Sequence, residues 1–64
     1  TSNLDIYRTA KLLIDQHGKD AAFHAGMMVD ELLDKGDLDG RAVWRQVLAA
    51  IEELQKVAPE GPVQ

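Results

Sequence analysis

The chain has 64 residues, no cysteine and a formal net charge of -4 at pH 7, from seven Lys and Arg against eleven Asp and Glu. This length allows one domain, and the missing cysteines exclude disulfides and thiolate metal sites as sources of stability. The negative charge repels phosphate backbones, so we do not expect a nucleic-acid partner, and no apolar run approaches the roughly 20 residues that span a bilayer.

The first predicted helix covers residues 4–17. Ser2 or Asn3 is its expected N-cap, and Gly18 is expected to end it in a left-handed conformation. At about 100° per residue, one stripe of this helix forms a core face. That stripe consists of Ile6, Ala10, Leu13, Ile14 and His17. Leu12 points away from it, which leaves one large apolar side chain without a place in the core.

The second predicted helix covers residues 20–35, with Asp20 as the expected N-cap and Gly36 as the stop. Because few residues separate it from the first helix, we expect these two helices to form an antiparallel hairpin. Phe23 and Met27 are four residues apart on one side of the helix. A broader apolar face lies on another side, formed by Ala21, Ala22, Ala25, Met28, Val29, Leu32 and Leu33. A helix that is apolar on two sides is usually central in a bundle or part of an interface.

The third predicted helix covers residues 38–57, and its N-cap is Asp37 or Asp39. It has the widest apolar face in the chain, formed by Val43, Trp44, Val47, Leu48, Ala50, Ile51 and Leu54. We therefore predict an all-α fold, a compact three-helix bundle over residues 1–58. Residues 59–64 have little to bury, and we expect them to form a mobile tail.

Two arrangements resemble metal sites. His17, Asp20 and His24 could meet where the first two helices join, but a structural zinc site needs a fourth ligand and none is near in the sequence. Asp37-Leu38-Asp39-Gly40 matches part of a calcium loop, yet the position that requires a bidentate Glu holds Gln46. We therefore predict no metal and no cofactor. His17 is expected to end the core stripe, and His24 to lie on the surface.

Catalytic signatures are absent from the sequence: there is no nucleophile elbow, no phosphate-binding glycine loop and no zinc-protease motif. We predict no catalytic residues. A helix-turn-helix interpretation would direct Arg41, Trp44 and Arg45 toward DNA from the start of the third helix. Three acidic residues around that helix start, Asp34, Asp37 and Asp39, oppose this alternative.

Two glycine turns and a tryptophan lie at a characteristic spacing. The segments concerned are Leu13-Ile14-x-x-His17-Gly18-x-x-Ala21, Asp30-Glu31-Leu32-Leu33-x-x-Gly36-Asp37-x-x-Gly40, Ala42-x-Trp44 and Ile51-Glu52-Glu53-Leu54. This pattern resembles a group of small bacterial proteins whose shared domain has no assigned function. The resemblance covers about residues 5–54. It implies a small, cytoplasmic, helical bacterial protein and brings no activity, cofactor or partner.

The surplus apolar side chains lead to the functional prediction. Leu12, Phe23 and Met27 are either buried when the second helix contacts both neighbours or form an exposed patch that binds a partner. The sequence leaves both open. We expect a non-enzymatic protein-interaction module, a homodimer or an accessory subunit, that uses these three residues. The alternative is a DNA-associated regulator that uses Arg41 and Arg45. The start of the chain lacks a signal-peptide pattern, so a cytoplasmic location is expected.

Overall fold

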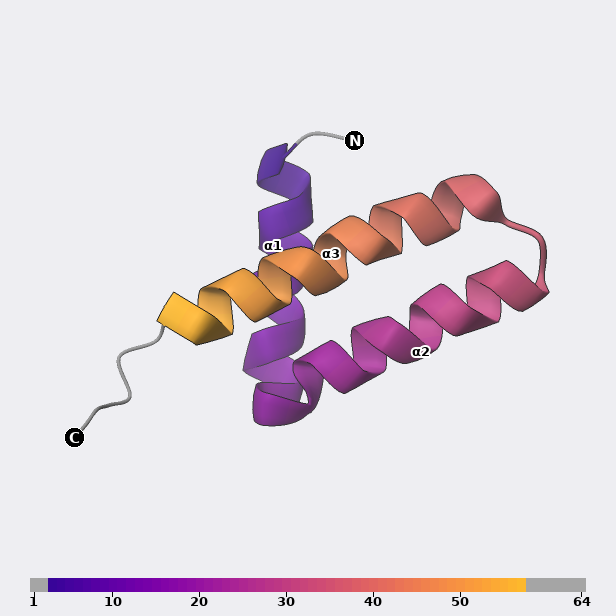
Figure 1. Ribbon diagram of the computed structural model, residues 1–64. Coiled ribbons are helices and arrows are strands. Elements are labelled where there is room, and N and C mark those ends of the chain that lie inside the picture. Colours follow the sequence, from indigo (N-terminus) through magenta and orange to yellow (C-terminus); the bar gives the residue numbers. More distant parts are fainter. Residues whose placement is uncertain (1–2, 58–64) are drawn as a thin grey trace.

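The computed structural model describes residues 3–57 (Figure 1). Helix α1 spans Asn3–His17, the 3-10 turn η1 spans Gly18–Asp20, α2 spans Ala21–Asp34 and α3 spans Leu38–Val57. Within this part of the chain every residue outside 35–37 is helical, so the fold is all-α. The helix bounds lie within about one residue of the predicted ones. The predicted cap Ser2 and the predicted tail 59–64 lie outside the described residues.

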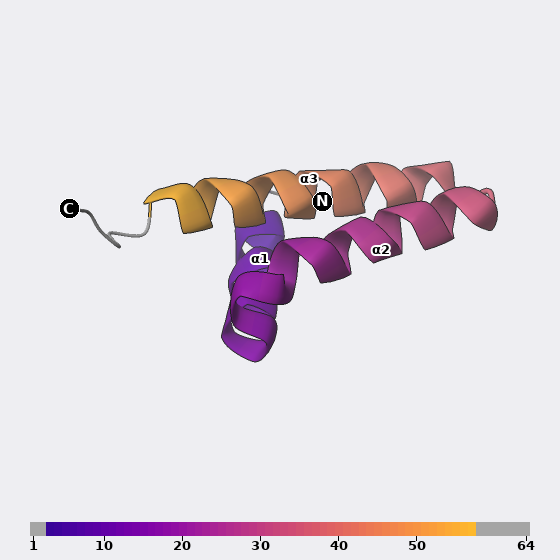
Figure 2. The same cartoon turned by 60° about the horizontal axis from the view of Figure 1, so that its bottom comes forward.

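The prediction of an all-α fold is confirmed, but the predicted three-helix bundle is wrong. Residues 3–34 form one bent helical segment, α1-η1-α2, and α3 is a second segment that lies along α2 and crosses α1 steeply (Figures 1 and 2). The extensive contacts are those of α3 with α2 and with α1, whereas α1 and α2 contact each other little. The hairpin is therefore formed by α2 and α3, and the prediction of a hairpin between the first two helices is wrong.

The junction after α1 explains this difference. Gly18 has a φ of 59°, as expected of a glycine that ends a helix, but the next residues continue as a 3-10 turn that leads directly into α2. The chain bends there without folding back. Asp20 makes no side-chain capping hydrogen bond, so its predicted capping role is wrong. The Gln55 side-chain amide donates a hydrogen bond to the Gly18 carbonyl at 2.9 Å, which ties the bend to α3.

The turn after α2 does reverse the chain. Gly36 has a φ of 76°, its N–H donates to the Leu33 carbonyl at 3.0 Å, and the Asp37 N–H donates to the Leu32 carbonyl at 2.9 Å. These two bonds form a Schellman motif. The Asp37 carboxylate then accepts a hydrogen bond from the Gly40 N–H at 2.9 Å, so Asp37 is the N-cap of α3. A Cβ at Gly40 would lie 2.5 Å from that carboxylate, which explains the glycine there.

The core lies where the three helices meet, and its side chains are small. Half of the buried apolar residues among residues 3–57 are alanines, which let the helix backbones approach closely. The largest fully buried side chains are Ile51 and Val47. Trp44 and Leu13, both predicted core residues, are half-buried and pack against the core. The buried apolar set is Ile6, Ala10, Ala21, Ala25, Val29, Val47, Ala50 and Ile51.

Candidate functional site

The side of α2 that points away from the core has two large exposed apolar side chains. Phe23 is 68% exposed and Met27 is 51% exposed. On the opposite side, Ala21, Ala25 and Val29 are buried against the other helices. We call the buried side the inner face. The outer face of α2 is defined by Phe23, Gly26, Met27 and Asp30. Burial within one chain therefore does not account for Phe23 and Met27.

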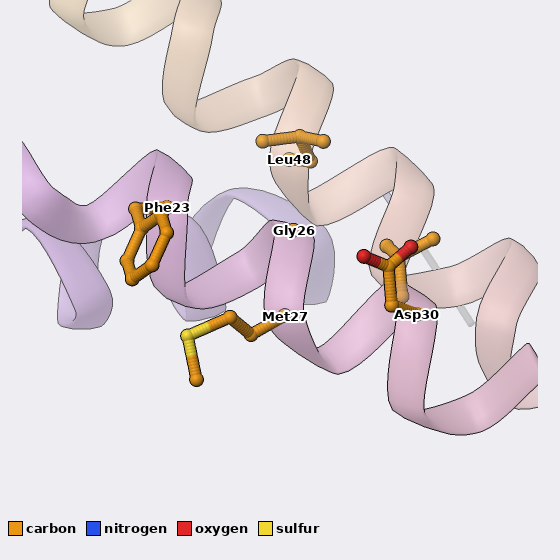
Figure 3. Close-up of a pocket in the computed structure, with 6 residues that line it drawn as sticks. Phe23, Gly26, Met27, Asp30 and Leu48 are labelled. Carbon is orange, nitrogen blue, oxygen red and sulfur yellow. The ribbon is translucent and has the colours of Figure 1, made fainter. Parts of the chain in front are cut away.

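A shallow hollow of about 330 Å³ lies along this outer face. Figure 3 shows Phe23, Gly26, Met27 and Asp30 along α2, with Leu48 across from them on α3. The Met27 side chain extends along the helix toward the Phe23 ring. Val29 also lines the hollow and Asp30 adds a carboxylate at its edge. An open, mostly apolar hollow of this kind suits an inserted side chain better than a small molecule, which needs an enclosed pocket.

Gly26 lies in the middle of α2, where glycine is costly. A glycine inside a helix lowers stability by roughly 0.5–1 kcal/mol relative to alanine. A Cβ built at Gly26 would have no neighbour within 4 Å, so packing within the chain does not require a glycine there. Its φ is not positive either, unlike those of Gly18 and Gly36. Gly26 therefore leaves a flat, accessible stretch of backbone in the centre of the outer face.

Leu12, the third predicted partner-binding residue, lies on α1 and is 55% exposed. It is not among the residues that line the hollow beside Phe23 and Met27. Leu33, predicted to belong to the core-facing side of α2, is 48% exposed, so that assignment is wrong. Leu33 belongs to the last turn of α2, and the end of α2 lies beyond the region that α1 crosses (Figure 1).

A second hollow, of about 260 Å³, lies in the angle between α1 and the hairpin. His17 of α1 and His24 of α2 stack there with ring centroids 3.8 Å apart and planes inclined by 23°. His24 is thus half-buried, and its predicted surface position is wrong. Met27 lines both hollows, so it separates them. The remaining lining residues are Leu13, Met28, Glu31 and Trp44.

The stacking geometry bears on the metal hypothesis for His17, Asp20 and His24. The lone pair of an imidazole nitrogen lies in the plane of the ring. Two stacked, nearly parallel rings therefore point their lone pairs in parallel planes, and the lone pairs do not converge on one metal ion. Among residues 3–57, no three His, Cys, Asp or Glu side chains are placed to hold a metal ion. The contact instead joins the end of α1 to the start of α2 across the bend.

The residues of the DNA-binding alternative differ in their surroundings. Arg41 and Trp44 are half-buried, whereas Arg45 is exposed. The Arg41 Nε is buried and has no hydrogen-bond partner among the described residues. The acidic residues beside them have local roles: Asp37 caps α3, and Glu31 pairs with Lys35 at 3.5 Å. Only one of the three proposed DNA contacts thus projects fully into solvent.

One polar contact joins α1 to α3 at the surface. The Tyr7 hydroxyl donates a hydrogen bond to Oε1 of Glu53. This hydrogen bond, with smaller effects of desolvation and of the Glu53 charge, raises the pKa of Tyr7 above its usual value of 10.0. Tyr7 is therefore an exposed aromatic residue with a hydrogen-bond partner on another helix, whereas the Phe23 ring contacts the ring of the adjacent His24 edge to face, with centroids 6.1 Å apart.

Other proteins do not identify the site. Comparisons with protein-family models, curated proteins and solved structures find no match to this chain. The resemblance to small bacterial proteins stays a prediction. Within residues 3–57, no helix combines the length and the apolar character needed to cross a membrane. The local geometry of α2 is therefore the basis for a functional proposal.

Sequence reasoning identified Phe23 and Met27 but missed three of their neighbours. Gly26 and Asp30 share the outer face because they lie three and seven residues after Phe23, a spacing that could have been read from the sequence. Leu48 was assigned to the core of the third helix, and its place beside the hollow depends on how α3 lies against α2. Nothing in the sequence indicates that Leu48 lies beside the hollow.

Proposed function

We propose that this chain is a non-enzymatic protein-interaction module that binds a protein partner through the outer face of α2, with Leu12 on α1 as a further contact. The observation that carries the proposal is the exposure of Phe23 and Met27 beside a hollow that their own chain leaves open. Exposed aromatic and methionine side chains that adjoin each other are typical of the centre of an interface.

The small core supports the same conclusion. A chain of this size buries only about 60% of the surface that its unfolded form exposes, and here half of the buried apolar residues are alanines. Covering Phe23 and Met27 with a partner would remove further apolar surface from water and stabilise the fold. A soluble protein seldom keeps such adjoining side chains exposed without a use for them.

The test compares the wild-type chain with the double variant Phe23→Asp/Met27→Asp. Circular dichroism first establishes that the variant keeps its helix content, which we expect because both side chains are exposed. Immobilised wild type should bind a specific protein or a second copy of itself, and the variant should lose it. Leu38→Asp is the matched control, since Leu38 is 64% exposed on α3 and does not line the hollow. A monomeric wild type that retains the same proteins as the double variant would contradict the proposal.

A further inference from the structure

The second hollow, in the angle between α1 and the hairpin, is lined by the rarest side chains of the protein. The sequence contains two methionines, two histidines and one tryptophan. All five line this hollow of about 260 Å³: Met27, Met28, His17, His24 and Trp44. They come from three helices, and the proposed function uses only Met27 among them. Two thioethers, two imidazoles and an indole therefore surround one small space.

The donor atoms of this hollow are soft and uncharged. Thioether sulfur selects Cu(I), and imidazole also binds copper, whereas carboxylate and carbonyl oxygens suit harder ions. The one carboxylate among the lining residues belongs to Glu31, which pairs with Lys35 at 3.5 Å. Neutral ligands compensate little positive charge, and an uncompensated charge is costly away from water. This donor set therefore suits an ion with a single charge better than a divalent ion.

We propose that His24, Met27 and Met28 bind Cu(I) in this hollow. Met27 and Met28 follow His24 by three and four residues, and side chains at these spacings are neighbours on one face of a helix. Met28 is half-buried, and Met27 lines the hollow with a flexible side chain that is 51% exposed. The ligands are one imidazole nitrogen and two thioether sulfurs. This proposal does not depend on the proposed function.

The two remaining aromatic residues have supporting roles. His17 is a positioning residue, because its ring stacks on that of His24 with centroids 3.8 Å apart. The stacking covers one face of the His24 ring and leaves the nitrogens at the edge of the ring accessible. His24 is assigned as the ligand because it shares α2 with both methionines, whereas His17 lies across the bend. Trp44 lines the hollow from α3, and an indole attracts a cation that lies over its face.

Ag(I) is a suitable first probe, since it has the charge and softness of Cu(I) and needs no reductant. Added as the nitrate to the full chain in chloride-free buffer, it should bind in a one-to-one ratio and change the fluorescence of Trp44, the only tryptophan. Cu(I), supplied anaerobically with ascorbate, should bind in the same ratio. Zn(II) should bind much more weakly, because thioethers are poor ligands for it. Zn(II) binding as tight as that of Ag(I), or an absence of Cu(I) binding, would overturn the proposal.

Two matched variants distinguish the ligand from the residue that positions it. His24→Phe keeps a ring in the stack but removes the ligand nitrogen. Because loss of an outer-shell partner already costs 10–100-fold in metal affinity, this loss of a ligand should cost about 100-fold or more. His17→Phe also keeps the stack and should bind Ag(I) like the wild type. Circular dichroism establishes that both variants keep their helix content. Equal losses would overturn the assignment of His24, and tight binding by both would overturn the site.

Met27→Leu/Met28→Leu tests the two sulfurs. Leucine conserves the volume of methionine, so the fold should be kept, while the Ag(I) affinity should fall about 100-fold or more. Leu38→Asp is the control, since Leu38 is exposed and does not line this hollow. Wild-type affinity in the double leucine variant would overturn the proposal. A chain that binds no Ag(I) but loses a protein partner in Phe23→Asp would overturn this site and leave the proposed function standing.

Discussion

The two faces of α2 belong to one helix of 14 residues and have opposite surroundings. On the inner face, Ala25 is fully buried. On the outer face, Phe23 keeps 68% of its surface in contact with solvent. The small residue is buried and the large one is exposed, which is the reverse of what a monomer alone would favour. We infer that the inner face determines the fold, and the proposed function assigns the outer face to a partner.

The largest expected loss of stability comes from a substitution on the inner face. Ala25→Asp would bury a carboxylate without a partner and should lower the free energy of unfolding by about 4 kcal/mol or more. A domain of this size has little more than that in total, so the variant should have lost most of its helix signal in circular dichroism. Phe23→Asp on the outer face should change the free energy of unfolding by less than about 1 kcal/mol. Equal destabilisation by the two variants would remove the distinction between the faces.

The second prediction compares substitutions at two glycines, Gly36 and Gly26. Gly36→Ala should lower the free energy of unfolding by about 1–2 kcal/mol, because the φ of 76° is strained for an alanine. Gly26→Ala should raise it by about 0.5–1 kcal/mol at protein concentrations where the chain is monomeric. Urea unfolding followed by circular dichroism measures both. The opposite signs sharpen the comparison, since only the glycine at the turn has a role within one chain.

The third prediction compares substitutions at two carboxylates, Asp37 and Asp30. Asp37→Ala removes the N-cap of α3 and should lower the free energy of unfolding by about 1 kcal/mol. Asp30→Ala should be neutral or slightly stabilising in the monomer, because Asp30 has no hydrogen bond or ion pair to another described residue and alanine favours helix. The same urea titrations provide the measurement. A clear loss of stability in Asp30→Ala would mean that the outer face supports the monomer fold.

The smallest expected effect concerns Tyr7, the only tyrosine in the chain. Its pKa is raised in the folded state, so its hydrogen bond to Glu53 stabilises the fold fully below pH 10 and is lost as the pH rises through the folded-state pKa. In Tyr7→Phe, the free energy of unfolding should fall less steeply as the pH rises above 10, because the hydrogen bond is already absent. The tyrosinate absorbance of the wild type should titrate above the usual value, and Glu53→Ala, which removes the acceptor, should move the pKa of Tyr7 back toward that value. An unchanged titration in Glu53→Ala would contradict this origin of the raised pKa.

Local sequence signals predicted the elements well. Apolar stripes at helical spacing predicted three helical stretches, and Gly36 with Asp37 or Asp39 predicted the turn at which α2 ends and α3 begins. These features depend on residues within a few positions of one another, which is the range over which helix capping and turn geometry act. Phe23 and Met27 were predicted as candidate contacts for the same reason, since their spacing places them on one side of a helix.

The sequence alone determined that this chain is helical, where its helices end, and which side chains share a helix face. Only the tertiary structure decided that α2 pairs with α3 and not with α1, because the Gly18 turn continues as helix and backbone propensity does not encode the direction in which a bent segment packs. It also decided that Phe23 and Met27 stay exposed beside Leu48. Burial depends on which helices lie against one another, and the buried alanines of α1, α2 and α3 mark where they do.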